Sequence, residues 1–101
     1  MAGTSKYRPT KPHIYGASKH WKKRGYIVLI AGYPFDLVGI RREDPDWPVE
    51  FIQVKRVETV AQAKRLLAKF KEDPPLLPSE HYHLVMEVQV KGTTDVLSVT
   101  I

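Results

Sequence analysis

The sequence predicts an α/β fold in which a central sheet is flanked by helices. Two helical segments and five strand-like segments follow one another along 101 residues in the order helix, three strands, helix, two strands. Apolar residues recur at every second position in the strands and at every third or fourth position in the helices. Hydrophobic residues make up 43% of this length, which is enough for one core. We expect a single domain over residues 10–101, preceded by a flexible basic arm over residues 1–9.

The first helix is expected to begin near Thr10 and to end before Gly25. Thr10 is the predicted N-cap, and Pro12 falls in the first turn, where proline is tolerated. Three cations directly before Gly25 lie where the helix dipole favours them. The apolar face of this helix is formed by Ile14, Ala17 and Trp21.

Three strands are expected next. Residues 26–31 are an uninterrupted apolar run between glycines, which predicts a buried strand. Residues 35–42 and 49–56 alternate with a period of two. The segment between them contains two prolines and three acids, so it stops both strands and suits a hairpin connection.

The second helix has the clearest signals in the chain. Thr59 is the predicted N-cap, and Gln62 completes a capping box. The expected apolar stripe is Val60, Ala63, Leu66, Leu67 and Phe70. The opposite face carries Lys64, Arg65, Lys69 and Lys71, and such a charged face is more often solvated than bound to DNA. Residues 83–91 and 95–101 alternate on either side of a turn, which predicts a closing hairpin.

Positive charge is concentrated at the N-terminus. Residues 1–24 hold seven of the 16 basic side chains and none of the 11 acids. A basic arm that continues into a basic helix indicates salt-sensitive contact with a phosphate backbone, although basic tails are often only solubilising. The predicted nucleic-acid contacts are Lys6, Arg8, Lys11, Lys19, Lys22, Lys23, Arg24 and Arg56.

Composition excludes several classes of protein. The chain has no cysteine, which excludes disulfides, thiolate catalysis and a cysteine zinc site. There is no apolar run of about 18 residues and no signal-peptide pattern, so we expect a cytoplasmic protein without a membrane span. His81 and His83 are spaced as a pair of zinc ligands, but the absence of further ligands nearby favours an ordinary strand start.

Three polar side chains stand out in the predicted central strands. Asp36 lies within an otherwise apolar strand, and Gln53 and Lys55 share one face of the next strand. Glu50 is three residues from Gln53 and therefore faces the other way. The spacing of these residues alone is weak evidence for a functional site, because an isolated aspartate can cap a turn and many strands end in lysine.

The segment over residues 34–55 resembles the PD-(D/E)xK nuclease superfamily, and in particular archaeal Holliday junction resolvases and Mrr-type nucleases. The resemblance covers most of the chain and implies a restriction-endonuclease-like αβββαβ core with a mixed sheet. It implies that Asp36 binds a divalent metal, that Gln53 replaces the usual second acid, as in Mrr-like members, and that Lys55 serves the attacking water. The backbone carbonyl of Val54 would be a further ligand for Mg²⁺ or Mn²⁺.

The resemblance implies a metal-dependent endonuclease that acts on duplex or branched DNA as a homodimer. The first helix has no acid where the family often has a glutamate, and His13 is the nearest polar residue; Glu87 is a candidate replacement ligand. Two alternatives remain open: a nuclease-fold protein that binds nucleic acid without cleaving it, and an interaction module whose binding is insensitive to salt.

Overall fold

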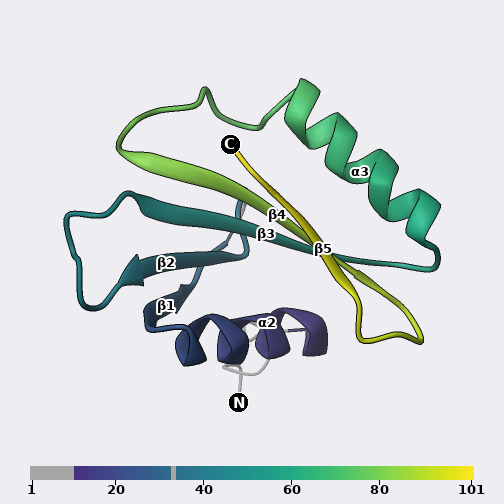
Figure 1. Ribbon diagram of the computed structural model, residues 1–101, viewed down its shortest axis with the longest axis horizontal. Helices are drawn as coiled ribbons and strands as arrows, with labels where there is room; N and C mark the ends of the chain where they lie inside the picture. Colours follow the sequence, from purple (N-terminus) through teal and green to yellow (C-terminus); the bar gives the residue numbers. More distant parts are fainter. Residues whose placement is uncertain (1–10, 33) are drawn as a thin grey trace, which may run out of the picture.

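The computed structural model describes residues 11–32 and 34–101, which form two helices and one five-stranded sheet (Figure 1). The order of helices and strands is the predicted one. The predicted arm over residues 1–9, with Lys6 and Arg8, lies outside the described residues. The elements are α2 (Pro12–Lys23), β1 (Tyr26–Ile30), β2 (Leu37–Arg41), β3 (Val49–Val57), α3 (Val60–Glu72), β4 (Tyr82–Val90) and β5 (Val96–Thr100).

The sheet is mixed and its strands lie in sequence order, β1-β2-β3-β4-β5. Neighbouring strands are antiparallel except β3 and β4, which run parallel over nine positions, from Val49↔Tyr82 to Val57↔Val90. The connection between these parallel strands contains α3, as parallel pairing requires. Figure 1 shows α2 and α3 on opposite faces of the sheet. The protein is therefore an α/β fold with a helix on each face.

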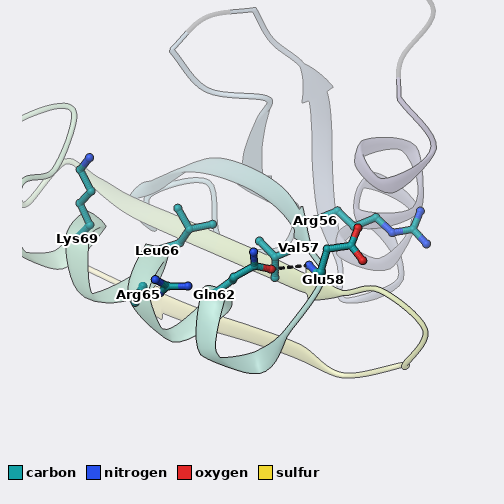
Figure 2. A pocket seen from close by; sticks show the side chains of 7 residues that line it. All are labelled: Arg56, Val57, Glu58, Gln62, Arg65, Leu66 and Lys69. Carbon is teal, nitrogen blue, oxygen red and sulfur yellow. Dashed lines mark hydrogen bonds between the residues drawn. The ribbon is translucent and has the colours of Figure 1, made fainter.

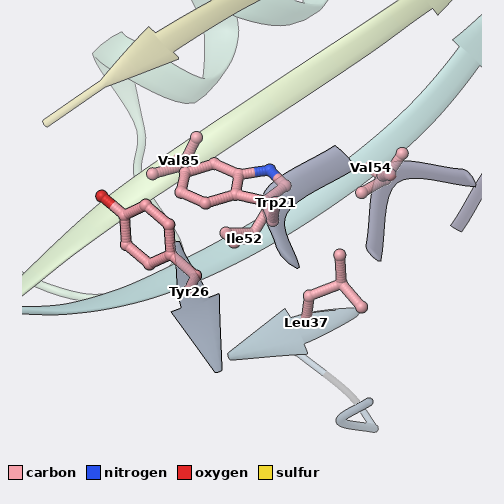
Figure 3. Close-up of a cluster of buried hydrophobic side chains, with 7 residues drawn as sticks. Trp21, Tyr26, Leu37, Ile52, Val54 and Val85 are labelled. Carbon is pink, nitrogen blue, oxygen red and sulfur yellow. The ribbon is translucent and has the colours of Figure 1, made fainter. Parts of the chain in front are cut away.

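Helix α2 begins one residue later than predicted, with Lys11 rather than Thr10 at the N-cap and no side-chain cap. Proline at the first helical position explains this start, because its fixed φ suits N1 and it needs no hydrogen-bond partner there. Gly25 ends the helix with a φ of 95°. The buried face of α2 packs on the sheet in a cluster shown in Figure 3, formed by Ala17, Trp21, Tyr26, Leu37, Ile52, Val54 and Val85.

Helix α3 covers the other face of the sheet, where it packs against β3, β4 and β5. The predicted capping box is present: Thr59 accepts from the Gln62 backbone, and Gln62 accepts from the Thr59 backbone. Ala63 and Phe70 are buried as predicted. Val60 is 42% exposed and does not belong to the stripe, because it is the first residue of the helix and lies outside the cluster beneath α3.

The prediction of a buried strand over residues 26–31 is wrong. Among the described strands, β1 lies at the edge of the sheet and pairs with β2 alone. Tyr26 is buried under α2, but Ile27, Leu29 and Ile30 are 40%, 54% and 55% exposed. Ile27 and Leu29 lie on the face opposite Tyr26, where α3 packs on β3, β4 and β5 and does not extend over β1, whereas Ile30 ends the strand on the α2 side. An apolar face is therefore open to solvent along this edge.

Candidate active site

Asp36 lies directly before β2 rather than inside it, and its backbone is already held by both neighbouring strands. Its N–H donates to the carbonyl of Ile52 at 3.0 Å, and its carbonyl accepts from the N–H of Ala31 at 2.8 Å. The Oδ2 atom of the half-buried carboxylate accepts a hydrogen bond from the backbone N–H of Val54 at 2.8 Å. The chain therefore fixes this carboxylate against the middle of β3.

Gln53 and Lys55 flank Val54 on β3. Both line a hollow of about 320 Å³ between β3 and α3, so they share a face of the strand as predicted. Gln53 is half-buried, and its Nε2 donates to the carbonyl of Pro34 at 3.5 Å, whereas Lys55 is exposed. Asp36 is not among the residues that line this hollow; its carboxylate approaches β3 at the backbone of Val54.

His13 belongs to the same neighbourhood. Its backbone carbonyl accepts a hydrogen bond from Gln89 of β4 at 3.2 Å, which anchors the start of α2 to the sheet. The pKa of His13 is lowered, chiefly because burial disfavours the charged imidazolium and because Lys11 is positively charged. The negative charge of Asp36 raises this pKa, and the positive charges of Arg56 and Lys55 lower it. The imidazole thus lies within the electrostatic influence of both Asp36 and Lys55.

The donors around Asp36 are chemically suited to a hard divalent cation. The carboxylate of Asp36, the amide oxygen of Gln53 and the carbonyl of Val54 are all oxygen ligands, which Mg²⁺ prefers, and Mg²⁺ keeps several waters when protein ligands are few. Among residues 11–32 and 34–101, no group of three or more His, Cys, Asp or Glu side chains could hold a metal. By its chemistry this donor type suits Mg²⁺ or Mn²⁺, and a single carboxylate predicts weak binding.

Glu87 was a candidate to replace the missing acidic metal ligand, but its carboxylate is already hydrogen-bonded within the core. It is only 8% exposed on β4, and the indole Nε1 of Trp21 donates to its carboxylate at 2.8 Å. A buried carboxylate needs such a donor to offset the loss of water. Glu87 therefore joins α2 to the sheet. Trp21 is itself buried, as expected for a core residue.

Glu50 is a second buried acid, and neither its burial nor its hydrogen-bond partners were predicted from the sequence. Glu50 is 4% exposed, accepts from the indole of Trp47 at 3.1 Å, and lies 2.9 Å from Nδ1 of His83. The parallel register places Glu50 directly opposite His83, and this pairing could be found only once the register was known. His81 is exposed beside Glu80, so the two histidines do not face a common ligand position.

The predicted basic contacts lie mostly along the exposed side of α2. Lys19, Lys22, Lys23 and Arg24 are exposed. The guanidinium of Arg24 lies 4.3 Å from the ring centre of Trp21, and Lys19 Nζ lies 4.9 Å from that of Tyr15. Lys11 is the exposed N-cap of the helix, and Arg56, at the end of β3, points away from α3 in Figure 2. The described part of the N-terminal basic region is therefore a solvated helix face.

No protein-family model, curated protein or solved structure matches this chain. In the described part of the chain, neither helix has the length and apolar character needed to cross a membrane. The functional argument therefore rests on the chemistry of four side chains: Asp36, Gln53, Lys55 and His13.

Proposed function

We propose that the protein is a metal-dependent endonuclease that hydrolyses phosphodiester bonds in DNA at Asp36, Gln53 and Lys55. The observation that carries this proposal is the 2.8 Å hydrogen bond from Val54 N–H to Asp36 Oδ2. It brings the carboxylate to the backbone of Val54, the residue between Gln53 and Lys55 on β3. Oxygen ligands for a divalent metal next to an ammonium group are suited to stabilising a transition state with growing negative charge on phosphate.

Each residue has a distinct role in this proposal. Asp36, the amide oxygen of Gln53 and the carbonyl of Val54 would hold Mg²⁺ or Mn²⁺, which would lower the pKa of a coordinated water and offset charge on the phosphate. Lys55 orients the attacking water and stabilises the phosphate oxygens. The water oxygen bonds to phosphorus and gives up a proton to solvent, while the bond to the sugar oxygen breaks and that oxygen takes a proton from solvent. His13 lies in the first turn of α2, and burial lowers the pKa of its imidazole.

A second candidate function is favoured by one observation. The described residues provide a single carboxylate at this place and no larger group of metal-binding side chains. A nuclease-fold protein that has lost a second acid would still bind DNA through its basic surface. Its binding would fall steeply with salt, and it would not cleave.

The experiment that separates these candidates is a cleavage assay with labelled single-stranded, duplex and four-way-junction DNA in Mg²⁺ or Mn²⁺. Asp36→Asn and Lys55→Gln test the site. Asparagine retains an oxygen that can accept from Val54 N–H, so the fold is expected to survive the change. Asp95→Asn, in the exposed turn before β5, and Lys64→Gln, on exposed α3, are matched controls with the same changes of charge.

The proposal predicts cleavage that requires metal and that falls about 10²-fold or more in Asp36→Asn and in Lys55→Gln, as for the loss of a key electrostatic group. Both controls should cleave like the wild type. Cleavage that persists in Asp36→Asn would overturn the assigned site. Salt-sensitive binding without cleavage, equal in all variants, would establish the second candidate instead.

The proposed enzyme acts as a homodimer, since a symmetric cut in two strands needs two sites related by a two-fold axis. The exposed apolar side chains of β1, Ile27, Leu29 and Ile30, support a contact between copies along this edge. Leu29→Glu should then shift the protein from dimer to monomer in sedimentation equilibrium. An unchanged mass in this variant would show that a dimer, if formed, uses another surface.

A further inference from the structure

Helix α3 and strand β3 enclose a groove that leads away from the proposed site. One hollow of about 500 Å³ lies where β3 ends and α3 begins, and Figure 2 shows the side chains around it. The second hollow, of about 320 Å³, contains Gln53 and Lys55. Leu66 and Lys69 border both hollows, so the two lie next to each other along α3, and we call the pair the α3 groove.

The groove carries positive charge on both walls. Arg65 and Lys69 border it from α3, and Lys55 borders it from β3; all three side chains are exposed. None of these three cations takes part in an ion pair with another described residue. Two acids also border the groove: Glu58, which is paired with Lys91 at 3.6 Å, and Asp73, at the far end of α3. The middle of the groove is therefore cationic.

We propose that this groove binds the sugar–phosphate backbone of a nucleic-acid strand and leads it to Gln53 and Lys55. The inference rests on the proposed function and assigns Arg65 and Lys69 as phosphate contacts. Residues four apart on a helix are about 6 Å apart along its axis. One DNA strand presents a phosphate about every 3.4 Å along the duplex axis, so the two cations can meet phosphates within about two nucleotides.

The side chains also differ usefully in chemistry. The planar guanidinium of Arg65 can donate two parallel hydrogen bonds to one phosphate, whereas Lys69 acts as a point charge. Leu66 and Val57 give the hollow an apolar surface suited to the sugar rings rather than to base edges. The groove is therefore expected to bind strands without sequence preference.

The four cations predicted on one face of α3 fall into two pairs, one that borders the groove and one that does not. Lys64 and Lys71 are exposed on α3 but border neither hollow of the groove, whereas Arg65 and Lys69 border it. The two pairs have equal charge and lie on the same helix. A comparison of the pairs therefore distinguishes the position of charge from its amount.

The test measures binding of fluorescein-labelled single-stranded and duplex DNA by fluorescence anisotropy over a NaCl series. EDTA is present, so that cleavage does not contribute. The variants are Arg65→Gln with Lys69→Gln, and Lys64→Gln with Lys71→Gln, with melting temperatures as the check on folding. The groove pair should weaken binding about 10-fold or more and reduce the slope of log K against log [salt] by about two, one for each phosphate contact. The control pair should change affinity less than about twofold.

An equal loss of affinity in both pairs would overturn the groove, because total charge rather than position would then govern binding. Unchanged binding in the groove pair, together with metal-dependent cleavage by the wild type, would overturn the groove alone and leave the nuclease proposal intact. A wild-type protein that binds neither DNA at low salt would overturn both proposals.

Discussion

The hydrogen bond between Trp21 and Glu87 offers a direct test of how α2 is held on the sheet. Trp21 is 4% exposed and Glu87 8% exposed, and the indole donates to the carboxylate at 2.8 Å. The informative changes are Trp21→Phe, which removes the donor, Glu87→Met, which removes the acceptor, and the two together. All three keep an apolar side chain of comparable size in the core.

The magnitudes follow from the burial of both partners. Trp21→Phe leaves a buried carboxylate without its donor, which costs about 1.5–3 kcal/mol for a bond to a charged group. Some apolar contact is lost in addition, although the edge-on pair with Tyr26, now at 4.8 Å, can persist with a phenyl ring. Glu87→Met leaves the indole N–H unsatisfied, at about 1–3 kcal/mol.

The double variant should cost less than the sum of the two single variants, because replacing both partners with apolar groups removes the unsatisfied atoms. We expect a coupling free energy of about 1.5–3 kcal/mol. Urea denaturation followed by far-UV circular dichroism measures it, and a domain stable by about 5–15 kcal/mol leaves enough range. Costs that add to within about 0.5 kcal/mol would refute the reasoning, since independent sites behave in that way.

Three further predictions concern single residues. Because burial lowers the pKa of His13 below its usual 6.5, the unfolded chain binds this proton first; its stabilising contribution is present above pH 6.5 and is lost as the pH falls. His13→Gln should therefore flatten the dependence of the free energy of unfolding of the metal-free protein on pH between about pH 5 and 7 in urea denaturation, and an unchanged slope would contradict this. Thr59→Ala removes the N-cap of α3 and should cost about 1 kcal/mol in a thermal melt, while Thr59→Ser should cost little. Gly39→Ala would place a β-carbon 3.3 Å from the ring of Tyr26. This ring is 6% exposed and packs edge-on against Trp21 at 4.8 Å, so it has little room to give way. We therefore expect a cost of about 1–3 kcal/mol, and a raised melting temperature would contradict it.

Features that depend on neighbouring residues were predicted well from the sequence. Features that depend on the packing of distant segments were not. The capping box of Thr59 and Gln62 and the stop at Gly25 are encoded within a few residues, so the sequence predicted both. The exposure of β1 depends on where the strand lies in the sheet and on which strands α3 covers. Its apolar composition carries no information about either, because a buried strand and an exposed edge strand can have the same apolar pattern.

The candidate site shows the same division. A period of two was enough to place Gln53 and Lys55 on one face and Glu50 on the other. The contact of Asp36 with the backbone of Val54 depends on the pairing of β2 with β3, which spacing alone does not fix. The partner of Glu87 was beyond reach, because its donor lies on a helix 66 residues earlier in the chain.

The parallel pairing of β3 and β4 also determines how the chain must fold. Its nine pairs join residues separated by the whole of α3 and its connecting loops, so closing this long loop costs entropy before any pair forms. Because the capping box of α3 is a local signal, we expect this helix to form before β3 and β4 pair, which would shorten the loop that has to close. Amide protons of β3 and β4 should then exchange with solvent only on global unfolding, while those of edge strand β1 exchange through smaller openings.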